Sequence, residues 1–249
     1  MPFTRKWDAS CPKIWYQFKQ DGRTYIIQDI PPQDDEQALQ ILVDHLCTDE
    51  ILCNLSDLIK DQESVDSIKT YWRDCLSQRM SLGCYTEVEG EMTMIGLNVC
   101  VVDSITDRFP TTPINGSAWK NIYYAKKFVE SKCDTFKILN VNLLLHGYGV
   151  VIKRKFRGAK LGARLFYARR RLALFHGIKG TSAVFTVPAS QAVGTRCGFT
   201  TIQQASLREI AKAGYQFPET DHLIKLMAQR YDDDKINTDI IDRDPLSVE

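Results

Sequence analysis

The stretch 150–174 constrains the fold more than any other part of the chain. An apolar strand end at 150–152 runs into a basic turn at 153–157, and Gly158 and Gly162 follow. Beyond the turn, apolar residues recur at helical spacing, at Leu161, Leu165, Phe166 and Leu172. The pattern predicts a strand, a cationic turn that contains glycine, and a helix.

A turn of this kind suits an anion. The first N–H groups of a helix have no partner within the helix, and the helix dipole favours negative charge beside them. Arg157 and Lys160 add positive charge, and glycines let the backbone approach a ligand closely. We interpret this turn as a diphosphate site. An amphipathic basic helix with a solvated face is the alternative interpretation of the same residues.

The glycine spacing narrows the choice of ligand. A dinucleotide-binding fingerprint needs three glycines and an acidic residue about twenty positions later, and a Walker loop needs Gly-Lys-Ser/Thr. Here two glycines are followed by the arginines 169–171, and neither pattern is present. Residues 157–162, RGAKLG, instead resemble the coenzyme A motif of the GNAT acetyltransferase superfamily, with Lys160 at the first glycine of that pattern.

Composition excludes several classes of function. The chain has 249 residues, 44% of them hydrophobic, which is enough for a core, and its net charge of +1 argues against a dedicated nucleic-acid binder. A nucleic-acid surface at 153–171 is a weaker hypothesis, which predicts affinity that falls steeply with salt. We find no signal-peptide pattern and no apolar run of membrane-spanning length, so we expect a cytoplasmic protein that does not bind membranes.

The cysteines and histidines give no sign of a metal site. The eight cysteines contain no CxxC pair, so we expect reduced, mostly buried side chains, and His45, His146, His176 and His222 lack ligand spacing. We therefore predict no metal. His146 is the histidine that we expect nearest to an active site, because it precedes the strand end at 150–152.

Strands and helices interleave along the chain without a linker, which favours one α/β (α+β) domain over 13–231. A short extension, 1–12, precedes this domain, and an acidic tail, 232–249, follows it and is expected to be disordered. In the first half of the domain we predict a hairpin over 13–30, a helix from Asp34, a helical region over 54–80 with Ser64 as a cap near its middle, and strands within 82–103. A loop over 103–117 and a helix over 119–129 follow. In the second half we predict a long strand over 136–152, a strand over 183–187, a helix over 188–196 capped by Gly198, and closing strands at 200–204 and 222–231.

Several segments resemble, in order, the insect arylalkylamine N-acetyltransferases within the GNAT superfamily. These segments are CTDEIL at 47–52, IGLN at 95–98, the coenzyme motif within 150–165, SQAVGTRCGF at 190–199 and HLIK at 222–225. The resemblance covers roughly residues 14–231. It implies a single GNAT-type domain with a mixed central sheet that contains a splayed pair of strands and is flanked by helices. It also implies acetyl-CoA as co-substrate and a small primary amine, arylalkylamine or polyamine, as the acceptor.

The acetyl transfer needs a base, because an amine is protonated at neutral pH and attacks a thioester only after losing a proton. Glu50 stands at the position of the family's proposed general base, so the resemblance implies that role for it. An acidic pair such as Asp49-Glu50 on an exposed helix end is the structural alternative.

The resemblance also implies how the coenzyme is held. Backbone groups of Val150, Val151 and Ile152 would bind the pantetheine arm, and the diphosphate would lie on Arg157, Gly158, Ala159, Lys160, Leu161, Gly162 and Ala163. The closing helix has no tyrosine that could protonate the leaving thiolate. Ser190 either contacts the sulfur there or stabilises the helix.

A different class of function stays open. Lys160 for glycine, Ile51 for the family's proline and the missing tyrosine are also what a catalytically degenerate GNAT-fold protein that binds acyl-CoA would show. We expect a monomer in either case.

Overall fold

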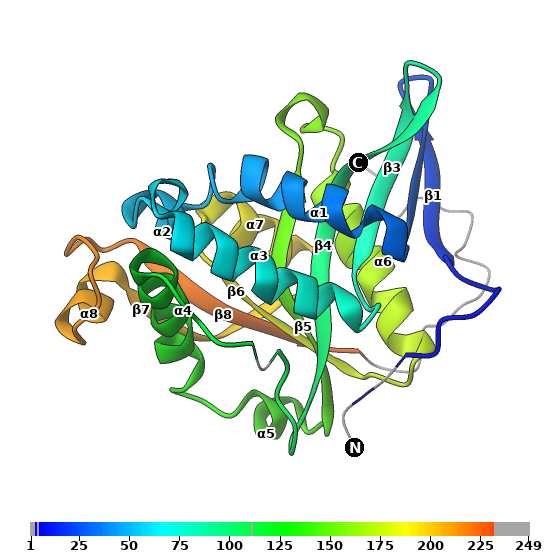
Figure 1. Ribbon diagram of the computed structural model, residues 1–249. Helices are drawn as coiled ribbons and strands as arrows, with labels where there is room; N and C mark the ends of the chain where they lie inside the picture. Colours follow the sequence, from blue (N-terminus) through cyan, green and yellow to red (C-terminus); the bar gives the residue numbers. More distant parts are fainter. Residues whose placement is uncertain (1–2, 4, 111, 232–249) are drawn as a thin grey trace.

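The computed structural model of the chain describes residues 3, 5–110 and 112–231, so the predicted acidic tail lies outside the described residues. Eight strands form one mixed sheet in the order β1-β2-β3-β4-β5-β6-β8-β7 (Figure 1). Only β5 and β6 are parallel neighbours; every other pair is antiparallel. The strands are β1 Ile14–Gln20, β2 Arg23–Asp29, β3 Leu82–Val88, β4 Glu91–Ser104, β5 Leu143–Ile152, β6 Gly180–Phe185, β7 Thr200–Ser206 and β8 Leu223–Arg230.

The helices lie between the strands in the sequence, as predicted. They are α1 Asp35–Ile41, α2 Ile51–Leu55, α3 Gln62–Ser77, α4 Ser117–Glu130, α5 Thr135–Leu139, α6 Leu161–Phe175, α7 Pro188–Arg196 and α8 Leu207–Lys212. A wide helical turn, Leu42–Leu46, extends α1, and a short 3-10 turn, Arg154–Phe156, precedes α6. The predicted mixed α/β fold with helices around a central sheet is confirmed.

The central strand β4 shows why helices cover both faces of the sheet. Leu97, Val99 and Val101 belong to the core beneath α1, α3 and α4, whereas Cys100 and Val102 belong to the core beneath α6. Side chains alternate between the two faces of a strand, so an uninterrupted apolar run needs cover on both. In Figure 1, α1 and α3 lie across one face and α6 lies across the other.

Strand β5 is irregular at the point where the active site is expected. Val99 of β4 pairs with Gly149, but Cys100 pairs with Gly147, so Tyr148 is an extra residue in the strand. The pairing of β5 with β6 ends at Gly147, opposite Ala183. The splayed pair of strands that the resemblance implies is therefore present, between β5 and β6.

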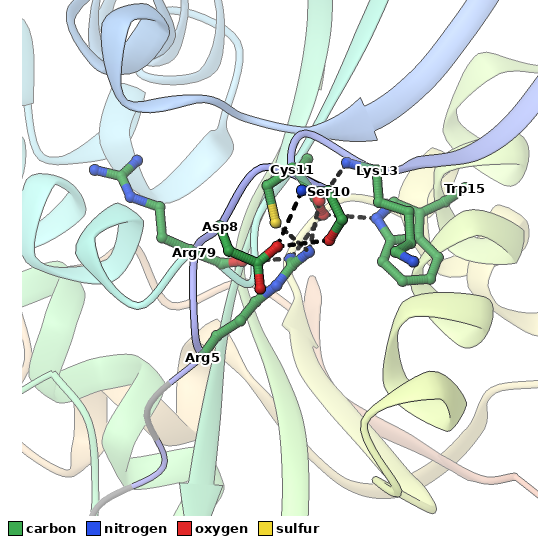
Figure 2. Close-up of polar contacts among 8 residues, drawn as sticks. Arg5, Asp8, Ser10, Cys11, Lys13, Trp15 and Arg79 are labelled. Atoms are coloured by element: carbon green, nitrogen blue, oxygen red, sulfur yellow. Dashed lines mark hydrogen bonds and ion pairs between the residues drawn. The ribbon is translucent and has the colours of Figure 1, made fainter.

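The segment before β1 is held by a buried ion pair. Arg5 donates to both carboxylate oxygens of Asp29 at 2.7 and 2.6 Å, and the Trp15 indole and the Lys13 backbone N–H donate to the same carboxylate at 2.6 and 2.7 Å. Figure 2 shows Arg5, Lys13 and Trp15 converging there. Arg5 also donates to the carbonyl oxygen of Arg79 at the end of α3. Arg5 thus ties the segment before β1 to β2 and to the turn that follows α3.

Two local predictions were wrong, and one helix was not predicted. Asp61, not Ser64, caps α3, because its carboxylate accepts the Ser64 N–H at 3.1 Å. The predicted strand 136–152 begins only at Leu143, because Asp134 caps a short helix, α5, before it. Helix α8, which was not predicted, begins with a capping box of Ser206 and Glu209.

Five of the eight cysteines are buried, as predicted: Cys47, Cys53, Cys75, Cys84 and Cys100. Within the described ranges, no helix combines the length and apolarity needed to cross a bilayer. In the same ranges, no group of three or more His, Cys, Asp or Glu side chains is placed to hold a metal ion.

Candidate active site

The predicted coenzyme turn folds as strand, turn and helix. Strand β5 ends at Ile152, the turn 154–156 follows, and α6 begins at Leu161. The first hydrogen bond of α6 runs from the Arg164 N–H to the Lys160 carbonyl oxygen at 3.2 Å. The N–H groups of Leu161, Gly162 and Ala163 precede that bond, so the helix offers them no acceptor. These three donors stand at the positive end of the helix dipole.

Two glycines leave room above these donors. A Cβ added at Gly158 or at Gly162 would meet no atom within 4 Å, and Gly158 has a φ of +99° that favours glycine. This open space lies beside the backbone where the sequence predicts a diphosphate.

Lys160 has a left-handed backbone conformation, which glycine adopts without strain. Its φ is +53°, in the left-handed region, and it is the N-cap of α6. The turn therefore keeps its tight form, although a side chain at this conformation costs about 1–2 kcal/mol.

The arginines of the turn have an internal partner. Arg154 and Arg157 both donate to the carboxylate of Asp49, which immediately precedes α2 and Glu50. These two guanidinium groups hold the pKa of Asp49 below its ordinary value despite partial desolvation. Arg157 also donates to the Ile152 carbonyl oxygen at 3.0 Å. It thus links the strand end to Asp49, a contact between residues more than a hundred positions apart that sequence spacing does not reveal.

The predicted pantetheine strand has one free edge. Val150, Val151 and Ile152 pair with Asn98, Leu97 and Gly96 of β4. On their other side, the ladder with β6 stops before them, at Gly147. Among the described strands none pairs with this second edge, which leaves backbone groups available to an extended ligand.

A cavity of about 130 Å³ lies where β5 and β6 part. Its walls come from β5 and β6 and from the helices α2, α3, α4, α6 and α7. Among the predicted site residues, Glu50, Val150 and Ser190 line it, together with His146. The remaining predicted coenzyme residues, Val151, Ile152, Arg157, Gly158, Ala159, Lys160, Leu161, Gly162 and Ala163, are outside the lining and lie along the strand end and the turn. The predicted residues thus fall into two groups, one in the cavity wall and one along the strand end and the turn.

Glu50 lies inside this cavity wall and not on an exposed helix end. Its side chain is buried, Oε2 accepts the Cys53 N–H at 2.8 Å as the N-cap of α2, and Oε1 has no hydrogen-bond partner. Burial alone would raise the pKa of this carboxyl. The attraction of Lys126, with interactions from Thr186 and Cys53, outweighs burial and leaves the pKa below its ordinary value. Glu50 is therefore ionised at neutral pH, with one acceptor oxygen open.

Ser190 has a structural contact of its own. Its hydroxyl donates to the Val187 carbonyl oxygen at 2.8 Å in the first turn of α7, while the residue also lines the cavity. This contact supports the helix-stabilising interpretation of Ser190.

A polar network that the sequence did not reveal lies beside Glu50. His146 Nδ1 is 2.8 Å from the Ser182 hydroxyl, and His146 Nε2 is 3.4 Å from Glu130. Lys127 donates to Glu130 at 2.7 Å. Desolvation acts to raise the pKa of Glu130, but His146 and Lys127 lower it to about 2. His146 thus lies beside the site, as predicted from its position before the splayed strand.

Aromatic side chains form another part of the cavity wall. Tyr71 makes edge contacts with Trp119, Tyr123 and Tyr148, with ring centroids 5.4, 5.8 and 5.4 Å apart. Edge-to-face packing of this kind stabilises a cluster and leaves ring surface for an apolar ligand. Trp119 and Tyr123 come from α4, a helix that the sequence predicted without indicating which face it presents to the site.

Solved structures of acetyltransferases resemble this chain over most of its length. A putative arylalkylamine N-acetyltransferase 7 from the yellow fever mosquito Aedes aegypti matches with a TM-score of 0.83 and 26% identity, over 92% of this chain and 100% of the other. Arylalkylamine N-acetyltransferase 2 from Aedes aegypti matches with a TM-score of 0.72 and 17% identity, over 84% and 99%. A polyamine N-acetyltransferase of Drosophila melanogaster matches with a TM-score of 0.67 and 16% identity, over 83% and 99%.

No protein-family model and no curated protein sequence matches the chain. The structural matches nevertheless define the class. The chain has the GNAT fold, and the match at 26% identity supports an enzyme of the N-acetyltransferase type. Within that class, it resembles the insect arylalkylamine N-acetyltransferases, as the sequence motifs predicted.

Proposed function

We propose that this protein transfers the acetyl group of acetyl-CoA to a small primary amine, with Glu50 as the general base. The observation that carries the proposal is the place of Glu50. A buried, ionised carboxylate with one unpartnered oxygen lines a cavity that opens between the parted strands β5 and β6. A buried acceptor without a partner is costly, so an unpaired carboxylate oxygen in a cavity favours a ligand that donates to it.

The chemistry follows from this arrangement. The substrate ammonium donates to Glu50 Oε1 and gives up a proton to the carboxylate, either directly or through one water. The free amine nitrogen then attacks the thioester carbonyl carbon. The C–N bond forms and the C–S bond breaks. The nitrogen gives up its second proton, through water, to the thiolate that leaves, and Glu50 releases the first proton to solvent.

The chain's own residues would hold the acetyl donor along the strand end and the turn described above. The free edge of Val150, Val151 and Ile152 would take the pantetheine arm as an added strand. The N–H groups of Leu161, Gly162 and Ala163, with Lys160 and Arg157, would bind the diphosphate over Gly158 and Ala159. Ser190 would lie beside the sulfur. Since Arg157 is paired with Asp49, the diphosphate would share or replace that partner.

A thiol-release assay with a panel of amines tests the proposal. We expect acetyl-CoA to raise the melting temperature and thiol release to depend on both acetyl-CoA and an amine. Gly162→Val should remove coenzyme binding, because the side chain enters the space above the helix N-terminus. It should keep the fold, because a Cβ at Gly162 meets no protein atom within 4 Å. Undiminished affinity in a correctly folded Gly162→Val variant contradicts the placement of the diphosphate.

The alternative is a GNAT-fold protein that binds acyl-CoA without catalysis. It predicts stabilisation by acetyl-CoA and no thiol release with any amine. The open oxygen of Glu50 favours the enzyme, because a binding protein has no need for a buried carboxylate without a partner.

A further inference from the structure

The charges around the cavity are unevenly matched. Lys126, Lys127 and Arg169 line it against Glu50 and Glu130, so three cations face two anions and leave a net charge of +1. Lys127 and Glu130 form an ion pair with each other at 2.7 Å. What remains is one carboxylate, Glu50, with Lys126 and Arg169.

Lys126 depends on Glu50 for its compensating charge. It comes from α4, is half-buried, and lowers the pKa of the Glu50 carboxyl by attraction. Across the described part of the chain, Lys126 makes no ion pair with a carboxylate within 4.0 Å. When a substrate ammonium docks on Glu50, it competes with Lys126 for the same negative charge. An amine substrate that also carried a negatively charged group would restore the charge balance of the cavity.

The buried polar atoms that have no hydrogen-bond partner also favour a ligand with a negatively charged group. The indole N–H of Trp119 and the Nε and Nη1 groups of Arg169 are buried donors with no hydrogen-bond partner, and both residues line the cavity. Arg169 is fully buried and uses its other nitrogen to donate to the carbonyl oxygens of Leu145 and Ser182. Neither an indole N–H nor a guanidinium can accept a hydrogen bond, so these groups suit a ligand that brings acceptor atoms and not one that brings only donors.

A polyamine fits this set of groups poorly. It carries two or more positive charges and only donors when protonated, whereas the cavity has a net positive charge and unused donors. Among the described residues, only Glu50 offers an open carboxylate oxygen there, since Glu130 is bound to Lys127 and faces His146. The edge-packed rings of Tyr71, Trp119 and Tyr123 instead suit an aromatic group.

We infer that the acceptor amine is aromatic and carries a carboxylate, as an aromatic amino acid does. Its ammonium binds Glu50, its carboxylate binds Lys126, and its ring packs against Tyr71, Trp119 and Tyr123. The inference rests on the proposed acetyl transfer and specifies its substrate class. The bonds made and broken are those already given for a simple amine, and the carboxylate takes no part in them.

Matched pairs of amines test it. L-Phenylalanine and 2-phenylethylamine differ only in the carboxylate, as do L-tyrosine and tyramine, and agmatine represents the polyamine class. We expect kcat/KM to favour the carboxylate-bearing member of each pair by roughly ten- to a hundredfold, the effect of one hydrogen bond to a charged group. Agmatine should be the poorest substrate.

Lys126→Met keeps the length and apolar stem of the side chain and removes its charge, so it should bring the ratio within each pair close to one. Lys120→Met is the matched control. Lys120 is exposed on the same helix and outside the cavity lining, so the variant should keep the wild-type ratio. Equal or better use of the decarboxylated amines by the wild type, or an unchanged ratio in Lys126→Met, overturns the inference while leaving acetyl transfer intact.

Binding measured by calorimetry separates the two levels of the proposal. If no amine gives thiol release, the proposed function fails. The binding of L-phenylalanine over 2-phenylethylamine, lost in Lys126→Met, would then still support the recognition of a carboxylate. If neither compound gives turnover or binding, the inference fails with the function.

Discussion

Asp29 and Glu50 are both buried carboxylates, but the protein uses them in opposite ways. Every hydrogen-bonding position of Asp29 that the structure describes is occupied, by both terminal nitrogens of Arg5, the Trp15 indole and the Lys13 N–H (Figure 2). Glu50 has one oxygen bound to the start of α2 and one oxygen without a partner. The first carboxylate fastens one end of the chain, and the second faces a cavity.

The difference shows how a structural buried carboxylate can be distinguished from one that is available to a ligand. An ion pair with all its lone pairs used offers nothing to a ligand, and breaking it leaves an uncompensated charge in the core. A carboxylate with one oxygen held by a backbone N–H is fixed in place, and its other oxygen still has capacity for a proton or an ammonium group. The number of partners, more than burial, distinguishes the two sites.

The largest effect on activity is expected at Glu50. Glu50→Gln removes the proton acceptor, so turnover at neutral pH should fall by roughly 10²–10⁴-fold, the usual contribution of a general base. The loss should be smaller at alkaline pH, where free amine is plentiful. Stability should change little, because the amide oxygen can still accept the Cys53 N–H. Unchanged activity across the pH range in steady-state assays would reject Glu50 as the base.

Asp29→Asn should show the opposite profile. It leaves the Arg5 guanidinium buried without its counter-ion, so the free energy of unfolding should drop by about 3–5 kcal/mol. Denaturant unfolding measures this change, and the specific activity of the folded fraction should be retained. Asp8→Asn is the control, since Asp8 lies on the exposed side of the same segment and bonds to Ser10. If the two variants were equally stable, the described contacts of Asp29 would contribute no net stability.

The smallest expected effect is a shift in the pH dependence of activity, which tests the protonation of Glu50. Lys126 lowers the pKa of the Glu50 carboxyl, so Lys126→Met should raise that pKa. Catalysis needs the carboxylate form, which is lost as the pH falls through the pKa. The acid limb of the kcat/KM profile should therefore move to higher pH, measured with an amine that carries no carboxylate. A limb that stayed in place would show that the limb reports a different group.

The sequence predicted the parts of the fold that depend on neighbours in the chain. The strand end 150–152, the turn and the start of α6 follow from residues within one short stretch, and α7 from Pro188 to Arg196 was predicted at its observed bounds. The Asp21-Gly22 hairpin turn has the positive φ values that its residue types favour. In each case, local propensity and tertiary packing agree.

Features that depend on distant contacts could not be predicted. Asp49 meets Arg154 and Arg157 only because the fold brings α2 beside the coenzyme turn. Lys126 and Lys127 appear in the sequence as ordinary helix charges, and only the placement of α4 over the parted strands puts both in the cavity wall. The apolar run after Asp134 was predicted as strand because its short capped helix has too little length to show a period.

The left-handed backbone at Lys160 has a consequence for how such chains are recognised. A search pattern that requires glycine at this position tests the side chain, whereas in the proposed function the ligand binds the peptide amides that follow. Lysine adopts the same dihedral angles with some loss of stability and adds a positive charge at the helix entrance. Relatives with the same substitution would keep the conformation of the turn while no longer matching the sequence motif.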